Sequence, residues 1–386
     1  MKLLITGSRS YTALDMARQL KRAGFDVYTA DCVKYPVCKA SNAVTRNFTI
    51  PSPRDQYRLF IDSLIAIIQK FRIDILIPSC EEIFYIAKGA HILNKYCRVF
   101  CDSFEKLSKL HNKWEFSLLT EHCSVRTPPT TLLRSAEDLQ LLPQKSEHYV
   151  FKPIYSRFGA RTLIAPAADK LARIEPSEHD QWIAQQYIAG KEYCSYHIAV
   201  DGRIQAHSCY EPLYRLGKAS SYYFHPIRHM EMERFAEQFV HQHHFTGHIA
   251  FDFIQGNDGQ LYVLECNPRT TSGLHVMAPN MLARMMEQSV VDHNPGVHPE
   301  AKTKPRMIAY AMLANPLYHG FQGIRRWAAD VKYAKDVLYD REDRLVPLFH
   351  AQSLAETIYD CFTKRISFKD AATANIEWNG EDLWDR

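Results

Sequence analysis

Strand-like and helical stretches alternate along the N-terminal part of the chain, and this alternation constrains the fold more than any other feature. Short apolar runs at Lys2–Thr6 and Phe25–Ala30 flank Tyr11–Ala23, whose apolar residues recur at helical spacing. Strands that alternate with helices form βαβ units with parallel strands. We therefore expect an open parallel α/β domain. Its further elements are Pro53–Phe71, Asp74–Pro78 and Arg98–Cys101.

From Tyr149 onward, strand-like runs follow one another with turns between them. The dipeptide Asp201-Gly202 and the run GNDG at 256–259 each separate two such runs, and both are typical of hairpins. A helical stretch at Met230–His243 divides the runs into two groups. This order predicts an α+β region with an antiparallel sheet. The expected strands are Tyr149–Ile154, Thr162–Ala165, Gln181–Ile188, Glu192–Val200, Arg203–Tyr210, Ile249–Ile254 and Gln260–Glu265.

The remaining segments read mainly as helical. One or two helices are expected over Phe104–His122, and one each over Ala278–Gln288 and Leu354–Thr363. The run Met307–Leu313 reads as a strand. The part of the chain after residue 295 shows no motif that assigns it a role.

Composition argues for an ordinary soluble protein and against several other classes. Of the 386 residues 46% are apolar and 23% charged, and the net charge is +4, which argues against a disordered chain and against a committed nucleic-acid binder. No apolar run is long enough to cross a membrane, and polar residues begin at Thr6, too soon for a signal peptide. The ten cysteines contain no CxxC pair, so we expect reduced thiols in a cytoplasmic protein.

The hairpin His248–Arg269 carries the strongest chemical signal in the chain. Asp252 lies on its first strand, and Glu265, Asn267 and Arg269 follow at alternate positions at the end of the second. Alternate residues of a strand share a face, and Asp252 can lie opposite Glu265. Two carboxylates and an amide oxygen on one face form an all-oxygen site of the kind that Mg²⁺ binds.

These residues also carry a resemblance to a known family. The run LYVLECNPR at 261–269 resembles the Glu-x-Asn-x-Arg signature of ATP-grasp enzymes. Three further segments resemble that family in the same order: Leu110–Trp114, Tyr149–Pro153 and Ala184–Glu192. The first 105 residues resemble the domain that precedes ATP-grasp in the carbamoyl phosphate synthetase-like branch. The resemblance covers about Met1–Gln288.

The resemblance implies a role for each matching residue. Lys113 and Lys152 would contact phosphate oxygens, and Asp252, Glu265 and Asn267 would hold Mg²⁺, with Mn²⁺ as an alternative. Arg269 would stabilise the acyl phosphate and the tetrahedral intermediate that follows it. The hinge residues that would bind adenine and ribose are Gln185, Gln186, Ile188 and Glu192.

Two segments depart from the family pattern. Gln185 stands where many members have an acid, and the loop 155–161 has a single glycine where the family's phosphate loop has several. Charge from Arg157 or Arg161 is therefore expected to replace part of the backbone N–H cradle. A loop at 212–218 is expected to bring a basic residue to the γ-phosphate, and Lys218 is preferred to Arg215 for this catalytic role.

The resemblance also implies a division of the chain. Residues 1–105 would form the pre-ATP-grasp domain and residues 106–295 the ATP-grasp domain. The latter would consist of a smaller lid subdomain at about 124–188 and a larger subdomain at about 189–295. Residues 296–386 would be a helical and strand-containing extension that the resemblance does not assign.

The implied activity is that of an ATP-dependent ligase. A carboxylate substrate would attack the γ-phosphate of ATP, and an amine, expected to be that of an amino acid, would capture the acyl phosphate, with release of ADP and phosphate. Two alternatives stay open: carboxylation chemistry with bicarbonate, and an ATP-binding module without catalysis. A nicotinamide site is disfavoured, because Gly7 stands alone where such a site needs several glycines. A homodimer is the base-rate expectation for the assembly.

Overall fold

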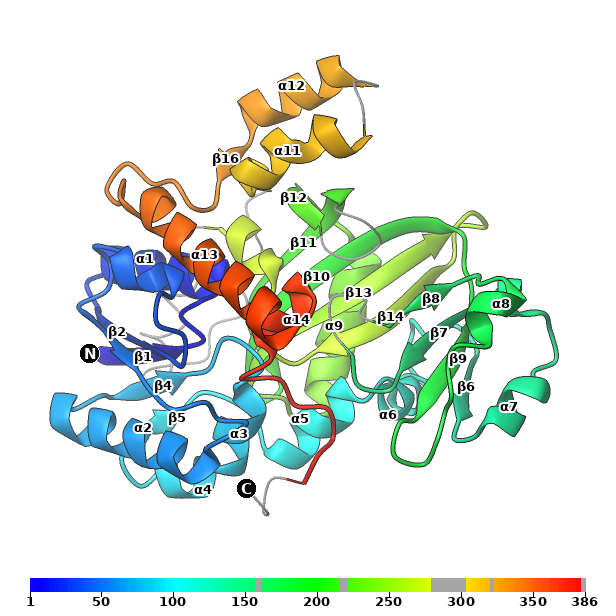
Figure 1. Ribbon diagram of the computed structural model, residues 1–386, viewed down its shortest axis with the longest axis horizontal. Helices are drawn as coiled ribbons and strands as arrows, with labels where there is room; N and C mark the ends of the chain where they lie inside the picture. The colour runs from blue at the N-terminus through cyan, green and yellow to red at the C-terminus, as the bar shows by residue number, and fades with distance from the viewer. Residues whose placement is uncertain (157–160, 216–220, 279–302, 320–322, 383–386) are drawn as a thin grey trace.

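The computed structural model describes residues 1–156, 161–215, 221–278, 303–319 and 323–382, and these residues form three sheets (Figure 1). The strand orders are β3-β2-β1-β4-β5, β6-β9-β7-β8 and β14-β13-β10-β11-β12-β15-β16. Arg157, Lys218 and almost all of the helix expected at Ala278–Gln288 lie outside the described residues. No helix within the described ranges has both the length and the apolar character that a membrane span requires.

The first sheet is parallel, as the alternation of strands and helices predicts. Each adjacent pair of its strands is parallel, with β1 at the centre. The chain runs from β1 outward to β3 and then returns to β4 on the other side of β1, so the strand order reverses between β1 and β4. Ligands of open α/β sheets bind beyond the carboxyl ends of the strands at such a point. The strands are β1 (Lys2–Thr6), β2 (Asp26–Asp31), β3 (Arg46–Thr49), β4 (Ile75–Ile77) and β5 (Arg98–Val99).

Helices cover both faces of this sheet and lead out of it. Ser103 and Asn112 begin two successive helices by accepting hydrogen bonds from backbone N–H groups, so the stretch expected as one or two helices consists of two. The helices of this part are α1 (Tyr11–Arg22), α2 (Tyr57–Phe71), α3 (Ile83–Lys88), α4 (Ala90–Leu93), α5 (Phe104–His111) and α6 (Lys113–Leu119), with a 3₁₀ turn η1 (Val37–Ala40).

The second sheet is small, antiparallel and apolar on one face. That face bears Leu133, Tyr149, Phe151, Trp182 and Ala184, which form a separate core. The sheet consists of β6 (Thr130–Leu133), β7 (Tyr149–Pro153), β8 (Leu163–Ile164) and β9 (Trp182–Gln186), and beside it lie α7 (Ala136–Gln140), η2 (Ser146–His148) and α8 (Ala168–Leu171).

The third sheet is the largest and is almost entirely antiparallel. The hairpin at Asp201-Gly202 joins β10 to β11, and both turn residues adopt positive φ, as this turn requires. The helix α9 (Met230–Gln242) packs Phe235 and Phe239 against Phe251 of this sheet. The strands are β10 (Gly190–Val200), β11 (Arg203–Arg215), β12 (Ser221–Ile227), β13 (Gly247–Gly256), β14 (Leu261–Asn267), β15 (Arg306–Met307) and β16 (Lys335–Asp336).

Two expectations about this region are wrong. The segment 212–215 is the end of β11 rather than a loop: Pro212 pairs with Phe224 of β12, beyond Tyr210, the last residue of β11 that pairs with β10. The run Met307–Leu313 is not a strand beyond Met307: the helix α11 (Ala309–His319) begins two residues later. Alanine, methionine and leucine in this run favour a helix, and its apolar character alone did not distinguish the two.

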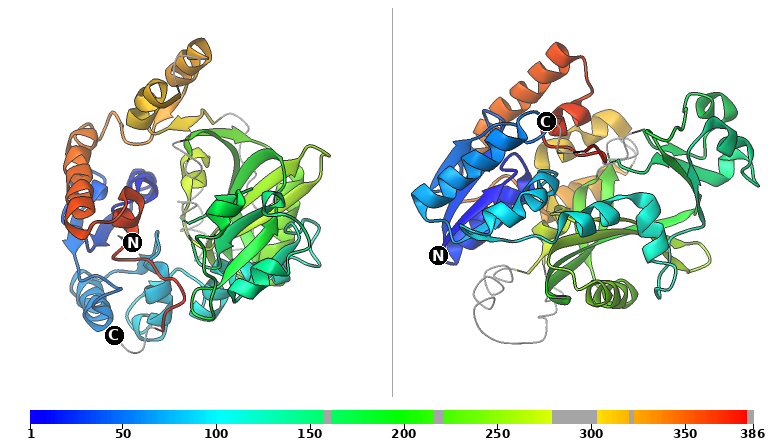
Figure 2. Two further views of the ribbon diagram at one scale, coloured as in Figure 1. Left: turned by 45° about the vertical axis from the view of Figure 1, so that its right-hand side comes forward. Right: turned by 90° about the horizontal axis from the view of Figure 1, so that it is seen from below.

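The C-terminal helices return to the N-terminal part of the molecule. In both figures α13 (Val346–Lys364), drawn in orange to red, lies beside α1, and Tyr11 of α1 hydrogen-bonds His350 of α13 (Figure 2). The other helices here are α12 (Ile324–Tyr333) and α14 (Phe368–Thr373), and a 3₁₀ turn η3 (Ser272–Val276) follows β14. The helix α13 therefore packs against the first helix of the parallel-sheet region.

Candidate nucleotide and metal site

The hairpin of β13 and β14 places its two acidic residues directly opposite each other. Asp252 of β13 pairs with Glu265 of β14, as the sequence predicts, and the register shifts at the next residue of β13. The Asn267 Nδ2 group donates a hydrogen bond to Asp252 Oδ2 over 3.3 Å. All three predicted metal ligands thus lie together at one end of the hairpin.

The two carboxyl groups are too close to ionise independently. Burial, and then the neighbouring Glu265 carboxylate, raise the pKa of Asp252. Burial also disfavours the charged form of Glu265, but Lys113 and Lys152 outweigh it and lower the pKa of Glu265. The pair therefore tends to hold one proton between two carboxyl groups.

This donor set fits a divalent cation. A cation would replace the shared proton and neutralise both carboxylates, and the Asn267 Oδ1 atom retains a lone pair besides the one that accepts from Arg269. The described residues contain no group of three His, Cys, Asp or Glu side chains placed to hold a metal. The remaining ligands would then be water or substrate oxygens, as is common for Mg²⁺.

Both predicted phosphate-binding lysines face this carboxylate pair. Lys113, the first residue of α6, is buried, and its Nζ atom lies 3.5 Å from Glu265 Oε2. The same Nζ donates a 2.8 Å hydrogen bond to the carbonyl oxygen of Ser156. Burial, together with the positive charge of Lys113, lowers the pKa of Lys152 to about 8 despite the attraction of Glu265. Two buried ammonium groups beside the Glu265 carboxylate favour the binding of an additional anion.

The small sheet distinguishes the two predicted adenine-binding glutamines. In its register Val150 lies opposite Gln185, and Lys152 opposite Ile183, so Gln185 and Lys152 share the face that is opposite the core. Gln186 pairs with Tyr149 and belongs to the other face. Gln185 is only 2% exposed and donates a hydrogen bond to Thr130 Oγ1 over 3.2 Å.

The hinge after β9 runs close to the backbone of the large sheet. A Cβ atom on Gly190 would lie 2.0 Å from the carbonyl oxygen of Gln255, so only glycine fits there. The predicted contact residue Ile188 lies near Gly256: its Cγ2 atom is 3.4 Å from the position that a Cβ atom on Gly256 would occupy. Glu192, two residues into β10, is exposed and forms an ion pair with Arg215.

Two predicted basic residues are placed differently from the lysines. Arg161 is exposed, forms an ion pair with Asp180 and stacks over Trp182, so its charge is already compensated. Arg215 is held by Glu192. Lys218 lies outside the described residues. The structure thus gathers Lys113, Lys152, Asp252, Glu265 and Asn267 around one point, and Arg161 is not among them.

Arg269 has a partner that the sequence analysis missed. Its Nε atom donates to Glu81 Oε1 over 2.7 Å, and its Nη2 atom donates to Asn267 Oδ1 over 3.2 Å. Glu81 is 2% exposed and follows β4 at the carboxyl end of the parallel sheet. An acidic residue in the turn that follows a strand beside the reversal of strand order is the signal that could have identified Glu81.

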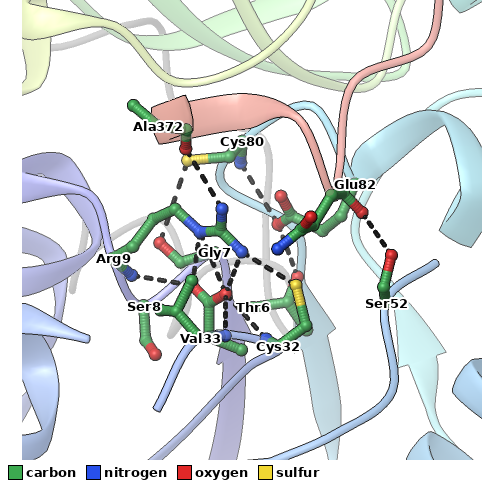
Figure 3. Close-up of polar contacts among 12 residues, drawn as sticks. Thr6, Gly7, Ser8, Arg9, Cys32, Val33, Ser52, Cys80, Glu82 and Ala372 are labelled. Atoms are coloured by element: carbon green, nitrogen blue, oxygen red, sulfur yellow. Dashed lines mark hydrogen bonds and ion pairs between the residues drawn. The ribbon is translucent and has the colours of Figure 1, made fainter. Parts of the chain in front are cut away.

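The carboxyl edge of the parallel sheet therefore meets the end of β14. The Thr270 hydroxyl donates to the Ser79 carbonyl oxygen over 2.5 Å, and it also contacts the Thr12 hydroxyl at 2.8 Å. Beside this contact, Arg9 donates to Asp31 and to the carbonyl oxygen of Ala372, and the Thr6 hydroxyl donates to Glu82 (Figure 3). Arg269 thus stands between the carboxylate pair and the edge where α/β folds bind ligands.

Comparisons with known proteins agree with this geometry. A family model described as an ATP-grasp domain matches residues 110–273. Comparison with curated proteins gives no match. The similar solved structures include an L-amino acid ligase from Bacillus licheniformis, with 14% identity and a TM-score of 0.59 over 79% of this chain and 78% of the other.

Two further similar structures have comparable values. N5-carboxyaminoimidazole synthetase from Staphylococcus aureus, complexed with ADP, has 13% identity and a TM-score of 0.62 over 79% of this chain and 80% of that one. Biotin carboxylase from Campylobacter jejuni has 14% identity and a TM-score of 0.59 over 76% and 72%. These likenesses confirm the fold, with its parallel N-terminal sheet before the ATP-grasp region. The family match identifies residues 110–273 as an ATP-grasp domain.

Proposed function

We propose that the chain is an ATP-dependent ligase that activates a carboxylate as an acyl phosphate and joins it to an amine, releasing ADP and phosphate. The observation that carries this proposal is the convergence of Lys113 and Lys152 on the paired carboxylates Asp252 and Glu265. Buried cations beside a cation-binding carboxylate pair suit a Mg²⁺-bound triphosphate. In further support, ADP is present in a similar structure.

Each residue has a role in this proposal that its surroundings support. Lys113 and Lys152 bind phosphate oxygens, and Gln185, on the same face as Lys152, contacts the base together with the Ile188 backbone. Glu192 binds the ribose hydroxyls once it leaves Arg215. Asp252, Glu265 and Asn267 hold Mg²⁺, or Mn²⁺ in its place. When bound, this ion would neutralise charge that develops during phosphoryl transfer.

Arg269 is the proposed catalytic residue. Its guanidinium lies between Asn267 of the metal site and Glu81 of the parallel sheet, so it can contact an oxyanion formed at that boundary. A carboxylate bound beside the metal site and an amine entering over the sheet edge would meet next to Arg269. The acyl phosphate is needed because an ionised carboxylate is a poor electrophile, and phosphorylation supplies a leaving group.

The other parts of the proposal concern organisation and assembly. We keep the division into residues 1–105, 106–295 and 296–386, in which the carboxylates and lysines belong to the middle unit. A cytoplasmic homodimer remains a proposal that size-exclusion chromatography with light scattering would test. The cysteines are compatible with the proposed cytoplasmic location, because all ten are free thiols. Burial raises the pKa of several of them, among them Cys80 and Cys101.

A second candidate function keeps the ATP chemistry and uses bicarbonate as the carboxyl substrate. It is favoured by the similarity to biotin carboxylase and to a 2-oxoglutarate carboxylase domain from Hydrogenobacter thermophilus, whose structure is a complex with bicarbonate. The two candidates differ in the substrate that stimulates ADP release.

The test is a turnover assay on purified protein with Mg²⁺ and ATP. Pools of amino acids and small carboxylates are added in one arm and bicarbonate with amines in the other, and ADP, AMP and phosphate are measured. The proposal expects ADP and phosphate to be released when the correct pool is present, and not in Glu265→Gln. Release of AMP and pyrophosphate would contradict it, and ATP binding without turnover in any pool would favour a binding module.

A further inference from the structure

The last described residues of the chain lie against the N-terminal part of the molecule. We call residues 374–382, which follow α14, the C-terminal strap; both views draw it in red beside the parallel-sheet region (Figures 1 and 2). The Tyr85 hydroxyl donates to the Glu377 carbonyl oxygen over 2.8 Å. Arg54 forms ion pairs with Glu377 at 2.5 Å and with Glu381 at 3.2 Å. These contacts attach the strap to α3 and to the segment that precedes α2.

The strap inserts one large side chain between two parts of the protein. Trp378 is 4% exposed, and its ring centroid lies 5.1 Å from that of Phe84 and 5.2 Å from that of Phe104. On its other side it meets the Tyr155 ring edge to face, with centroids 5.1 Å apart. Tyr155 follows β7, the strand that carries Lys152. Trp378 therefore joins the parallel-sheet region to the loop after this lysine.

The backbone of the strap contacts the same tyrosine independently. A Cβ atom on Gly380 would lie 2.5 Å from Cε2 and 2.9 Å from Cδ2 of Tyr155, and the residue has a φ of +92°. Both the close approach and the left-handed backbone require glycine. Trp378 and Gly380, two residues apart in the strap, thus both contact the Tyr155 ring.

Tyr155 connects the strap to the proposed nucleotide site. The residue after it, Ser156, accepts the 2.8 Å hydrogen bond from Lys113 Nζ. The residue before it, Ile154, accepts a 3.0 Å hydrogen bond from the backbone N–H of Lys113. A displacement of Tyr155 would therefore disturb both carbonyl oxygens that Lys113 contacts.

The strap also forms one wall of a cavity beside this loop. The cavity has a volume of about 630 Å³. Tyr155, Ser156 and Arg161 line it on one side, and Glu377 and Gly380 of the strap on the other. The strap thus lines the same cavity as Ser156, the residue whose carbonyl oxygen contacts Lys113.

We propose that the C-terminal strap is part of the nucleotide site, with Trp378 as a positioning residue that acts through Tyr155 and Ser156 on Lys113. This inference rests on the proposed function, because it assumes that Lys113 binds nucleotide phosphate. It gives a role to a C-terminal region that the sequence motifs leave unassigned. Removal of the indole should weaken nucleotide binding without touching any residue of the metal site.

The experiment compares full-length variants by titration calorimetry with MgADP and by thermal unfolding. Trp378→Ala is expected to weaken MgADP binding roughly two- to tenfold, the range for lost aromatic contacts. Trp378→Phe, which keeps an aromatic ring, should restore most of the affinity. Phe362→Ala is the matched control, because Phe362 is 81% exposed on α13. In turnover assays the KM for ATP should rise more than kcat falls.

A second variant covers the case in which Trp378→Ala does not fold. Gly380→Ala places a methyl group against the Tyr155 ring and should weaken MgADP binding in the same direction. Wild-type affinity in folded Trp378→Ala or Gly380→Ala, with only a lower unfolding temperature, would overturn the inference alone. Failure of the wild-type protein to bind MgADP would instead overturn the proposed function and the inference with it.

Discussion

The carboxylate pair Asp252–Glu265 and the ion pair Glu81–Arg269 meet at Asn267, but the chain specifies them in different ways. The first pair lies on neighbouring strands of one hairpin, so strand periodicity and a short turn fix it locally. The second joins residues 188 positions apart and exists only because the parallel sheet packs against the end of β14. The comparison separates the proposed nucleotide and metal site, which is specified locally, from the proposed substrate side, which depends on tertiary packing.

The largest effect is expected from removing charge in the local pair. Glu265→Gln keeps the shape of the side chain, but the metal loses a charged ligand and Lys113 loses its counter-charge. Turnover should fall about 10²- to 10³-fold, the range for loss of a preorganised electrostatic contact. Steady-state ADP release measures it, with the exposed Glu231→Gln on α9 as control. Near-normal turnover would contradict the metal assignment.

The second prediction concerns the long-range pair. Glu81→Ala leaves the Arg269 guanidinium without the carboxylate that orients it, and removal of outer-shell partners usually costs about 10- to 100-fold in activity. Affinity for MgADP should stay near that of the wild type, because the lysines and carboxylates are untouched. Calorimetry and turnover on the same preparation separate the two.

Glu81→Gln provides the control for this second prediction. Its amide can still accept the Arg269 hydrogen bond, so turnover should recover in part relative to Glu81→Ala. Loss of MgADP affinity in Glu81→Ala would show that the two regions are not separable. In that case the comparison drawn from the local and long-range pairs would fail.

The same contrast explains how far the sequence could predict this protein. The hairpin Asp252–Glu265 and the opposition of its carboxylates were predictable because strand period and turn length determine them. An acid after β4 could be singled out from the sequence, but its pairing with Arg269 could not, because nothing local indicates that this segment meets Arg269. The edge strand β3 was missed because its sequence, Arg46–Thr49, has a single apolar residue. The roles of the site residues remain predictions.

Face assignments show a similar limit within one short motif. Sequence similarity placed Gln185 and Gln186 together in the hinge, but successive strand residues point to opposite faces. The register of β9 with β7 determines which of the two glutamines would point toward the nucleotide. That register depends on the core of Tyr149, Phe151 and Trp182, and the first two of these residues lie on β7, outside the hinge motif.

The third prediction uses the pKa shifts of the carboxylate pair. Because the pKa of Asp252 is raised to about 7 in the folded protein, its ionisation opposes folding. The contribution of Asp252 to the stability of the metal-free protein should therefore fall as the pH rises from about 4, near the ordinary pKa of the group, to about 7, and should level off above pH 7. A metal must displace the shared proton, so apparent Mg²⁺ affinity should increase about tenfold from pH 6 to pH 8.

Thermal unfolding with and without Mg²⁺ across this pH range measures both effects. Asp252→Asn is the matched variant, since it removes the titrating group and keeps the shape of the side chain. Stability that is independent of pH in the wild type would contradict the shared proton. A pH dependence that persists in Asp252→Asn would assign it to another group.

The smallest effect sharpens the comparison at the edge of the nucleotide site. Gln185→Ala should weaken MgADP binding about fivefold, the loss of roughly one hydrogen bond, because Gln185 shares the face of Lys152. Gln186→Ala should leave binding unchanged, since Gln186 is exposed on the opposite face. Calorimetry on the two variants tests this assignment of faces directly. Equal losses of MgADP affinity would mean that β9 presents both glutamines to the nucleotide, so that the register of the strand does not determine this part of the site.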